Sequence, residues 1–111
     1  MSTKYLMTVK TTGVVSNRIF NEINDSMFEA VNEFNVKWHN KEHRYAMSMS
    51  TELFLNEYIE RNEIINFKVI CDERNNVFDI NTLVYNFDII FRQNHCINKT
   101  QLNYIINTKI K

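Results

Sequence analysis

Three short stretches of the sequence contain residue types that perform chemistry in proteins. The first is "HNKEH", in which His39, Glu42 and His43 follow the H-x-x-E-H zinc-binding pattern. Chemistry at such a site needs both histidines on one face of a helix as zinc ligands, and the glutamate as the base that activates the metal-bound water. The surrounding "NVKWHNKEHR" is polar, so we interpret it as a connection. A zinc hydrolase at these three residues is kept as a third hypothesis.

The second stretch, "FKVICDERNNVFD", places a cysteine beside two acids and an arginine. A reactive thiol at Cys71 would need a pKa that is lowered by nearby cations. Its neighbours Asp72 and Glu73 are acidic and raise that pKa instead. Cys71 also shares one side of an expected strand with Phe67 and Val69. We therefore predict a packed cysteine rather than a nucleophile.

The turn after this strand must be made without the usual turn residues, because the chain has one glycine and no proline. Asparagine and aspartate replace them, since their short side chains bond to nearby backbone groups and tolerate left-handed conformations. We therefore predict that Asp72, Asn75 and Asn76 turn the chain between two strands.

The third stretch is His95–Cys96, which contains the residues of a nucleophile and its base. Adjacent residues on a strand point to opposite faces, and the chain has no C-x-x-C motif. We predict that Cys96 is a small, partly buried side chain. The protein is expected to be no enzyme and to carry no metal or cofactor.

The composition favours a single domain over residues 1–111. Hydrophobic residues make up 44% of the chain, which is enough for one packed core. Lys plus Arg equals Asp plus Glu at 13 each, which argues against a protein that grips nucleic acid through its phosphates. The first residues lack the apolar segment of a secretory signal, and no apolar run is long enough to span a bilayer. We expect an intracellular protein with reduced thiols that binds neither nucleic acid nor membrane.

Two amphipathic helices are expected in the first half of the chain. Apolar residues recur at steps of three and four between Ile19 and Phe34, after a helix cap at Ser16. Asn24–Ser26 leaves open a division of this segment into two helices. The second clear helix is "SMSTELFLNEYIERN", with its cap at Ser50 or Thr51.

Strands are expected on both sides of these helices, because the apolar period changes to two. Two internal strands are expected at Phe67–Cys71 and Thr82–Phe91. The strand-like ends carry apolar residues on one face: Tyr5, Met7 and Val9 near the N-terminus, and Leu102, Tyr104 and Ile106 near the C-terminus. The predicted fold class is α+β, with two or three helices packed on one face of a mostly antiparallel sheet of about four strands, and strand-like terminal arms.

The run "INFKVICDERNNVFDINTLVYNFDIIFR" resembles the C-terminal domain of contractile phage tail sheath proteins. In that family a helix is followed by a strand that ends approximately in C-D-E-x-N-N, then by a loop, a long alternating strand and a last segment. The matching pieces cover roughly half of the chain. They are the helix Thr51–Asn62, the strand Phe67–Cys71, the turn Asp72–Asn76 with Cys71, Asp72, Glu73, Asn75 and Asn76 as its signature, the strand Thr82–Phe91, and Asn98–Asn107.

This resemblance implies a mechanical role. Sheath subunits are joined when terminal strands of one subunit add to the sheets of its neighbours, which gives affinity through main-chain hydrogen bonds. Met1–Thr11 and Gln101–Lys111 would be these inter-subunit strands. Sheath proteins are several times longer, so the resemblance implies a small virion protein of the tail sheath, neck or baseplate that assembles in the host cytoplasm. Its partners would be further copies of itself or other tail proteins (tube, sheath, baseplate).

Two alternatives to strand addition remain open. Monomeric proteins normally blunt their exposed edge strands, and Lys109 and Lys111 would do so at the C-terminus. A small phage-encoded adaptor or regulator that binds one host protein through its sheet is the second hypothesis.

Overall fold

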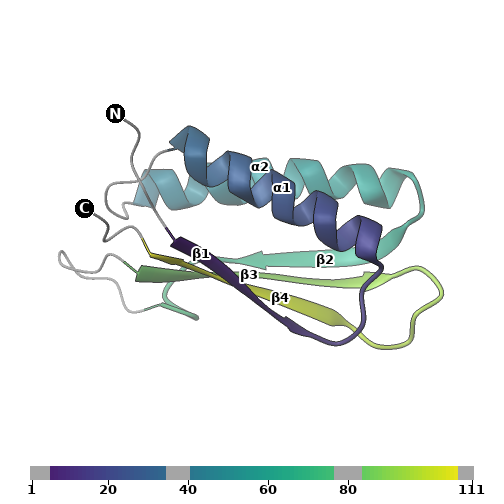
Figure 1. The fold of residues 1–111 in the computed structure, drawn as a ribbon. Helices are drawn as coiled ribbons and strands as arrows, with labels where there is room; N and C mark the ends of the chain where they lie inside the picture. Colours follow the sequence, from purple (N-terminus) through teal and green to yellow (C-terminus); the bar gives the residue numbers. More distant parts are fainter. Residues whose placement is uncertain (1–5, 35–40, 77–83, 108–111) are drawn as a thin grey trace.

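The structure of the chain is a computed structural model that describes residues 6–34, 41–76 and 84–107. The elements, in chain order, are β1 (Leu6–Thr12), α1 (Asn17–Phe34), α2 (Lys41–Glu60), β2 (Ile64–Ile70), β3 (Val84–Gln93) and β4 (Thr100–Asn107). Both helices lie on one face of a four-stranded sheet (Figure 1). The predicted α+β class, with its helices on one face of an antiparallel sheet, is therefore confirmed.

The strands lie in the order β1-β4-β3-β2, and every neighbouring pair is antiparallel. The N-terminal strand therefore does not project as an arm in this structure. It pairs with the C-terminal strand over its full length, from Leu6 opposite Asn107 to Thr12 opposite Gln101. β4 also pairs with β3 on its other side, so β4 lies inside the sheet, and β1 and β2 form its two edges.

The core lies between the sheet and the helices, and it is built by the alternation that the sequence predicts. On β3 and β4, every second residue points to the helices and is buried: Tyr85, Phe87, Ile89, Phe91, Leu102, Tyr104 and Ile106. The helices cover them with their own apolar faces: Ile19, Ile23, Met27 and Val31 from α1, and Met47, Leu55 and Tyr58 from α2. The predicted apolar faces of these two strands and of α1 are thus the core faces.

The first helix is continuous, so the alternative of two helices divided at Asn24–Ser26 is wrong. Ser16 caps its N-terminus, and the Ser16 hydroxyl oxygen accepts a hydrogen bond from the Ile19 amide at 3.3 Å. Asn24 remains inside the helix, where its side-chain oxygen accepts the Tyr104 hydroxyl proton. This contact ties the middle of α1 to β4.

The second helix begins at Lys41, about ten residues before its expected start, so the predicted cap at Ser50 or Thr51 is wrong. Thr51 is buried in the middle of the helix, and its hydroxyl donates to the Met47 carbonyl one turn earlier at 2.9 Å. The polar Glu42–Arg44 segment forms the first turn of α2 instead of a connection.

Two of the turns use non-glycine residues with positive φ: Asn62 at 61° after α2 and His95 at 67° after β3. Gly13, at φ 92°, is the exception, and it also allows a close approach, because a Cβ there would lie 2.8 Å from the Lys99 carbonyl oxygen. Asn62 agrees with the expectation that asparagine replaces glycine in turns, whereas the left-handed conformation of His95 was not expected.

Candidate functional site: the uncovered face of the sheet

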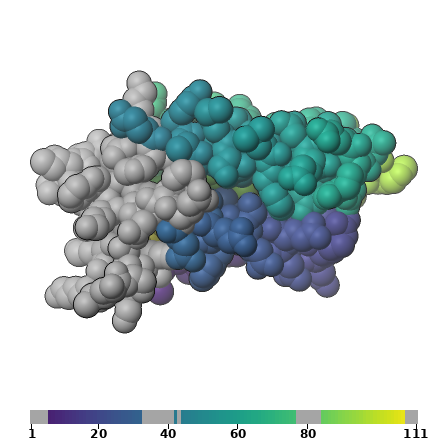
Figure 2. All heavy atoms as spheres, turned by 90° about the horizontal axis from the view of Figure 1, so that it is seen from above, coloured from purple at the N-terminus to yellow at the C-terminus, as the bar shows by residue number. Residues whose placement is uncertain are grey.

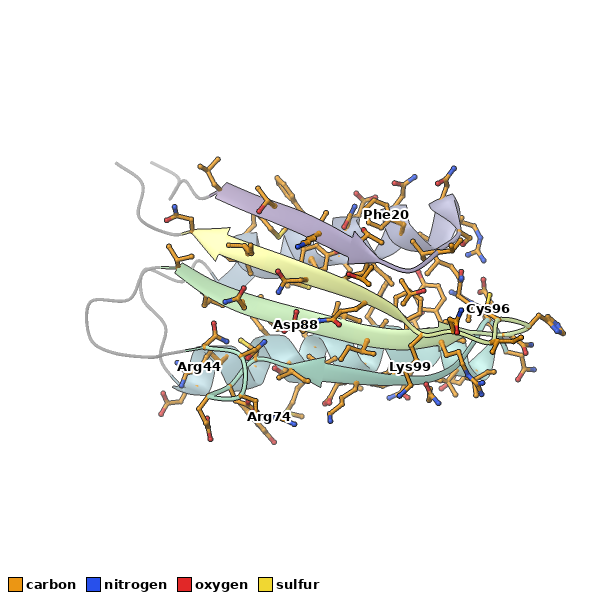
Figure 3. The ribbon with its side chains drawn as sticks, turned by 90° about the horizontal axis from the view of Figure 1, so that it is seen from below. Phe20, Arg44, Arg74, Asp88, Cys96 and Lys99 are labelled. Atoms are coloured by element: carbon orange, nitrogen blue, oxygen red, sulfur yellow. The ribbon has the colours of Figure 1, made fainter. Side chains whose placement is uncertain are left out.

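Among the residues that the structure describes, both helices cover the same face of the sheet, and we call the other face the floor. Figure 3 shows it from below, with both helices behind the strands. The floor consists of the residues that alternate with the core residues: Leu6, Thr8, Lys10 and Thr12 of β1; Gln101, Asn103, Ile105 and Asn107 of β4; Val84, Asn86, Asp88, Ile90 and Arg92 of β3; and Asn66, Lys68 and Ile70 of β2. Amide side chains make up much of this surface.

A buried carboxylate, Asp88, lies in the centre of the floor with only 7% of its surface exposed. Its two oxygens accept hydrogen bonds from Asn75 at 2.7 Å, from Asn103 at 2.6 Å and from Gln101 at 3.4 Å. A buried charge is tolerated only where hydrogen bonds replace its lost hydration. Three side-chain amides from two segments, the turn after β2 and strand β4, therefore meet at this carboxylate, and it organises the middle of the floor.

The turn after β2 supplies the first of these amides. The Asp72 carboxylate accepts the Arg74 backbone amide at 2.9 Å, and the Arg74 guanidinium also contacts it at 2.7 Å. These hydrogen bonds, aided by the positive charge of Arg74, lower the pKa of Asp72 to about 2. The Asp72 backbone amide in turn donates to the Asn75 side chain at 3.1 Å. The turn is thus closed by its own side chains.

From this turn, two asparagines reach back across the floor. The Asn75 side chain donates to the Ile70 carbonyl at 2.8 Å. The Asn76 side chain donates to the Asn86 carbonyl at 2.8 Å and accepts the Asn86 amide at 2.5 Å. Asn75 and Asn76 therefore bond like an added strand segment beside the start of β3, and they shield one side of Asp88 from water.

Cys71 lies at the end of β2 and is buried, with 8% of its surface exposed. Burial raises the pKa of its thiol to about 12; Arg44 opposes this rise, and Asp72 and Asp88 add to it. A groove of about 460 Å³ between α2 and β2 passes this residue, and Glu73 lines the same groove. A thiol with so high a pKa is not a nucleophile at neutral pH.

We predict that native protein treated with iodoacetamide at about pH 8 is alkylated at Cys96 and not at Cys71. Cys96 is partly exposed in the turn between β3 and β4, whereas Cys71 is both buried and protonated at this pH. Peptide mass spectrometry reads the site. Both thiols should react in denaturant, which serves as the control. Faster native labelling of Cys71 than of Cys96 would contradict the buried, protonated thiol.

The two edges of the sheet differ. Each edge strand carries one exposed lysine, Lys10 on β1 and Lys68 on β2, but only β2 shifts register, between Ile64 and Asn66, a feature that discourages pairing with another strand. β1 keeps an unbroken register over seven residues. A second groove of about 200 Å³ lies between β1 and α1, and its lining residues are Met7, Thr8, Val9, Asn24, Asp25, Phe28 and Tyr104.

The residues that the sequence singled out are placed as follows. Met7 and Val9 are half-buried on β1, whereas Leu102, Tyr104 and Ile106 are buried on the interior strand β4. Tyr5, His39, Lys109 and Lys111 lie outside the described residues; Glu42 and His43 lie in the first turn of α2. Within the described part of the chain, no group of three or more His, Cys, Asp and Glu side chains is placed to hold a metal ion.

Sequence reasoning did not identify Asp88 as the centre of a network. Because successive residues of β3 point to opposite faces, the burial of Phe87 in the core puts the next residue, Asp88, on the face away from the core. The available signal was the set of amides on the same side of neighbouring strands: Asn86 lies two residues before Asp88, and Asn103 lies directly opposite Asp88 on β4. The contribution of Asn75 depends on the path of the turn, which no periodicity predicts.

Comparison of the chain with protein-family models, with curated proteins and with solved structures found no match. Neither α1 nor α2, as far as the structure describes them, is apolar enough over a sufficient length to cross a membrane.

Proposed function

We propose that the chain is a non-enzymatic structural protein of a contractile phage tail, in the sheath, neck or baseplate, and that it joins neighbouring subunits by strand addition. The proposal is supported by the order of elements from Thr51 onward. A helix, a strand, the C-D-E-x-N-N turn and two further strands follow one another here, as in the sheath C-terminal domain that the sequence resembles. The virion tail is the corresponding location.

Of the two terminal strands, β1 is the better candidate for contact with a neighbour. β4 has partners on both sides, so its donation to another subunit would break two ladders and expose the buried Leu102, Tyr104 and Ile106. β1 has only β4 beside it among the described strands. Its outer edge offers main-chain donors and acceptors to an incoming strand.

The groove beside β1 is the observation that carries this proposal. Met7 and Val9 lie on the helix side of β1 and are only partly buried, and Phe28 of α1, which lines the same groove, has 54% of its surface exposed. A strand that is added beside β1 would place its alternate apolar side chains under α1, so the core would continue across the junction. Apolar burial at about 25 cal/mol per Å² would then add to the main-chain hydrogen bonds.

Proline substitutions at Thr8 and Val9 test this edge. In an antiparallel ladder, residues alternate between bonding the partner strand and pointing their N–H and C=O groups outward. One of Thr8→Pro and Val9→Pro therefore removes a bond to β4, and the other removes only an outward donor. We expect the first variant to lose stability, and the second to keep its fold and lose assembly with its neighbours. Thermal unfolding and light scattering at several concentrations measure the two effects.

Thr11→Ala is the matched control, because it alters a β1 side chain and leaves the backbone donors in place. If both proline variants folded and assembled like the unsubstituted chain, the outer edge of β1 would have no role in assembly. Sedimentation of phage particles provides the second check, because a component of the tail must be found in the fraction that contains the particles.

The second candidate, an adaptor that binds one host protein, is favoured by the floor itself, a broad sheet face with no helix over it (Figure 3). Affinity purification separates the two candidates. A single host protein at a fixed ratio, without tail proteins, would favour the adaptor.

A further inference from the structure

The two layers of the molecule carry opposite charge. Each helix contains four acidic residues, against one basic residue in α1 and two in α2. The four strands contain three basic residues, Lys10, Lys68 and Arg92, against the single acid Asp88. All three basic residues lie on the floor, and Asp88 is buried there by its amide partners. The balanced net charge of the chain therefore hides a separation of charge between its two broad sides.

On the outer side of the helices, which we call the roof, the acids gather in a groove. Figure 2 shows α1 and α2 side by side on this surface. The groove has a volume of about 370 Å³, and its residues are Glu22, Asp25, Ser26, Glu29, Phe54, Glu57, Tyr58 and Arg61. Glu22 bonds the Tyr58 hydroxyl and Arg18, and these bonds lower its pKa. Four carboxylates against the two guanidiniums of Arg61 and Arg18 leave the groove with a net negative charge that attracts a cation.

The roof also exposes a stripe of apolar side chains. Tyr45, Met49 and Leu53 follow one another at four-residue steps on α2, with exposures of 66%, 44% and 67%. Residues at this spacing lie on one side of a helix. Because α2 already buries Met47 and Leu55 against the sheet, it has apolar residues on two sides. An exposed apolar stripe of this kind marks an interaction surface more often than an isolated apolar residue does.

The floor carries a matching pattern. Leu6 and Val84 flank Asn107 on opposite sides, and Ile105 lies on the next row of the same strand. These three aliphatic side chains are 62%, 43% and 38% exposed and form one patch at the end of the sheet. Farther along the floor are the basic side chains. Each broad side thus combines an apolar patch with charge, and the sign of that charge is opposite on the other side.

From this complementarity we infer that the roof of one copy docks on the floor of a second copy. Roof against roof would bring the carboxylates of two grooves together, and floor against floor would do the same with the lysines; like charges in contact are unfavourable. Roof against floor places Lys10 or Lys68 toward the acidic groove and sets one apolar patch against the other. The contact joins two different surfaces, so each copy keeps one surface free for the next copy.

The size of the molecule is sufficient for such a contact. A specific interface buries about 800 Å² on each partner, roughly a tenth of the 7287 Å² accessible surface of this chain. Exposed ion pairs contribute little each, and most of the affinity would come from the apolar patches. This contact uses faces rather than edges, so it does not depend on strand addition at β1.

The test uses two variants that remove charge without adding any. The roof variant is Glu29→Gln with Glu57→Gln, and the floor variant is Lys10→Gln with Lys68→Gln; all four residues are exposed. Both are made in whichever proline variant at Thr8 or Val9 keeps its fold, so that edge pairing does not contribute. We call this proline variant without charge substitutions the parent chain. Sedimentation velocity over a concentration series should show that the parent chain self-associates. This self-association should weaken at about 0.5 M salt, because the attraction between exposed charges then extends over only a few Å. Each variant alone should associate about tenfold more weakly, which is about 1.4 kcal/mol.

Mixing the variants gives the decisive result. The intact floor of the roof variant can bind the intact roof of the floor variant, so an equimolar mixture should form mainly a one-to-one dimer, with the parent affinity, at concentrations where neither variant associates alone. The matched control, Lys99→Gln, removes one exposed charge from the turn between β3 and β4, outside both surfaces, and should leave association unchanged. A parent chain that stays monomeric at all concentrations would overturn the inference, as would a mixture that associates no better than its components.

Discussion

Replacing Phe87 by alanine is expected to lower the free energy of unfolding by about 3–5 kcal/mol. Phe87 has no exposed surface and lies on β3, an interior strand with β4 on one side. Removing its ring leaves a cavity in the core between the sheet and the helix layer, and the sheet cannot collapse into it without disturbing the strand pairs of β3. Domains of this size have a total stability of about 5–15 kcal/mol, so this single substitution should remove a large share of it.

Val84→Ala is the matched control for this substitution. It removes apolar atoms from the same strand, but Val84 points to the floor and is 43% exposed. Its effect should stay within about 0.5 kcal/mol. Urea unfolding followed by circular dichroism measures both variants. Equal losses for Phe87→Ala and Val84→Ala would mean that the floor is packed as tightly as the core, contrary to the assignment of the two faces.

Replacing Asp88 by alanine is expected to cost about 3 kcal/mol, although Asp88 lies on the face away from the core. The substitution removes the acceptor shared by Asn75, Asn103 and Gln101 and leaves their amides without it. Two of these hydrogen bonds are short and involve a charged acceptor, and such bonds contribute more than neutral ones. The turn after β2 should also loosen, because Asn75 is one of the donors.

Glu73→Ala, at an exposed acid in the same turn, is the control and should change stability by less than about 0.5 kcal/mol. Chemical denaturation gives the free energies, and hydrogen exchange at the Asn86 amide, which donates to Asn76, reports on the turn. A loss at Asp88→Ala no larger than that of the control would show that water satisfies these amides as well as the carboxylate does.

The fold was predictable where one physical pattern dominated. On β3 and β4 the period of two separates Phe87 and Tyr104 from Asp88 and Asn103 without ambiguity, because one side is buried and the other is polar. The start of α2 was not predictable in this way. Its first turns, Glu42–Arg44, are polar, and the Tyr45 that follows points to solvent, so no apolar stripe distinguishes these turns from a connection.

The candidate site was only partly visible in the sequence for a similar reason. The turn residues Asp72 and Asn75 could be identified from the lack of glycine and proline. The second role of Asn75, its hydrogen bond to Asp88, depends on a contact between positions thirteen residues apart. The pairing of β1 with β4 also depends on tertiary structure, since an alternating strand at a chain end has the same pattern whether it pairs with its own chain or with a neighbour.

That pairing also determines how the domain would respond to mechanical load. Leu6 at the start of β1 lies opposite Asn107 at the end of β4, so the two described ends of the chain meet at the same end of one ladder. A force that pulls these ends apart would break the β1–β4 pairs one after another, starting at Leu6 and Asn107. It would not load all seven pairs at the same time. Tension applied through the chain ends is thus resisted weakly, whereas compression across the two layers meets the packed core. The fold is mechanically anisotropic, and it is best suited to carry load across its faces.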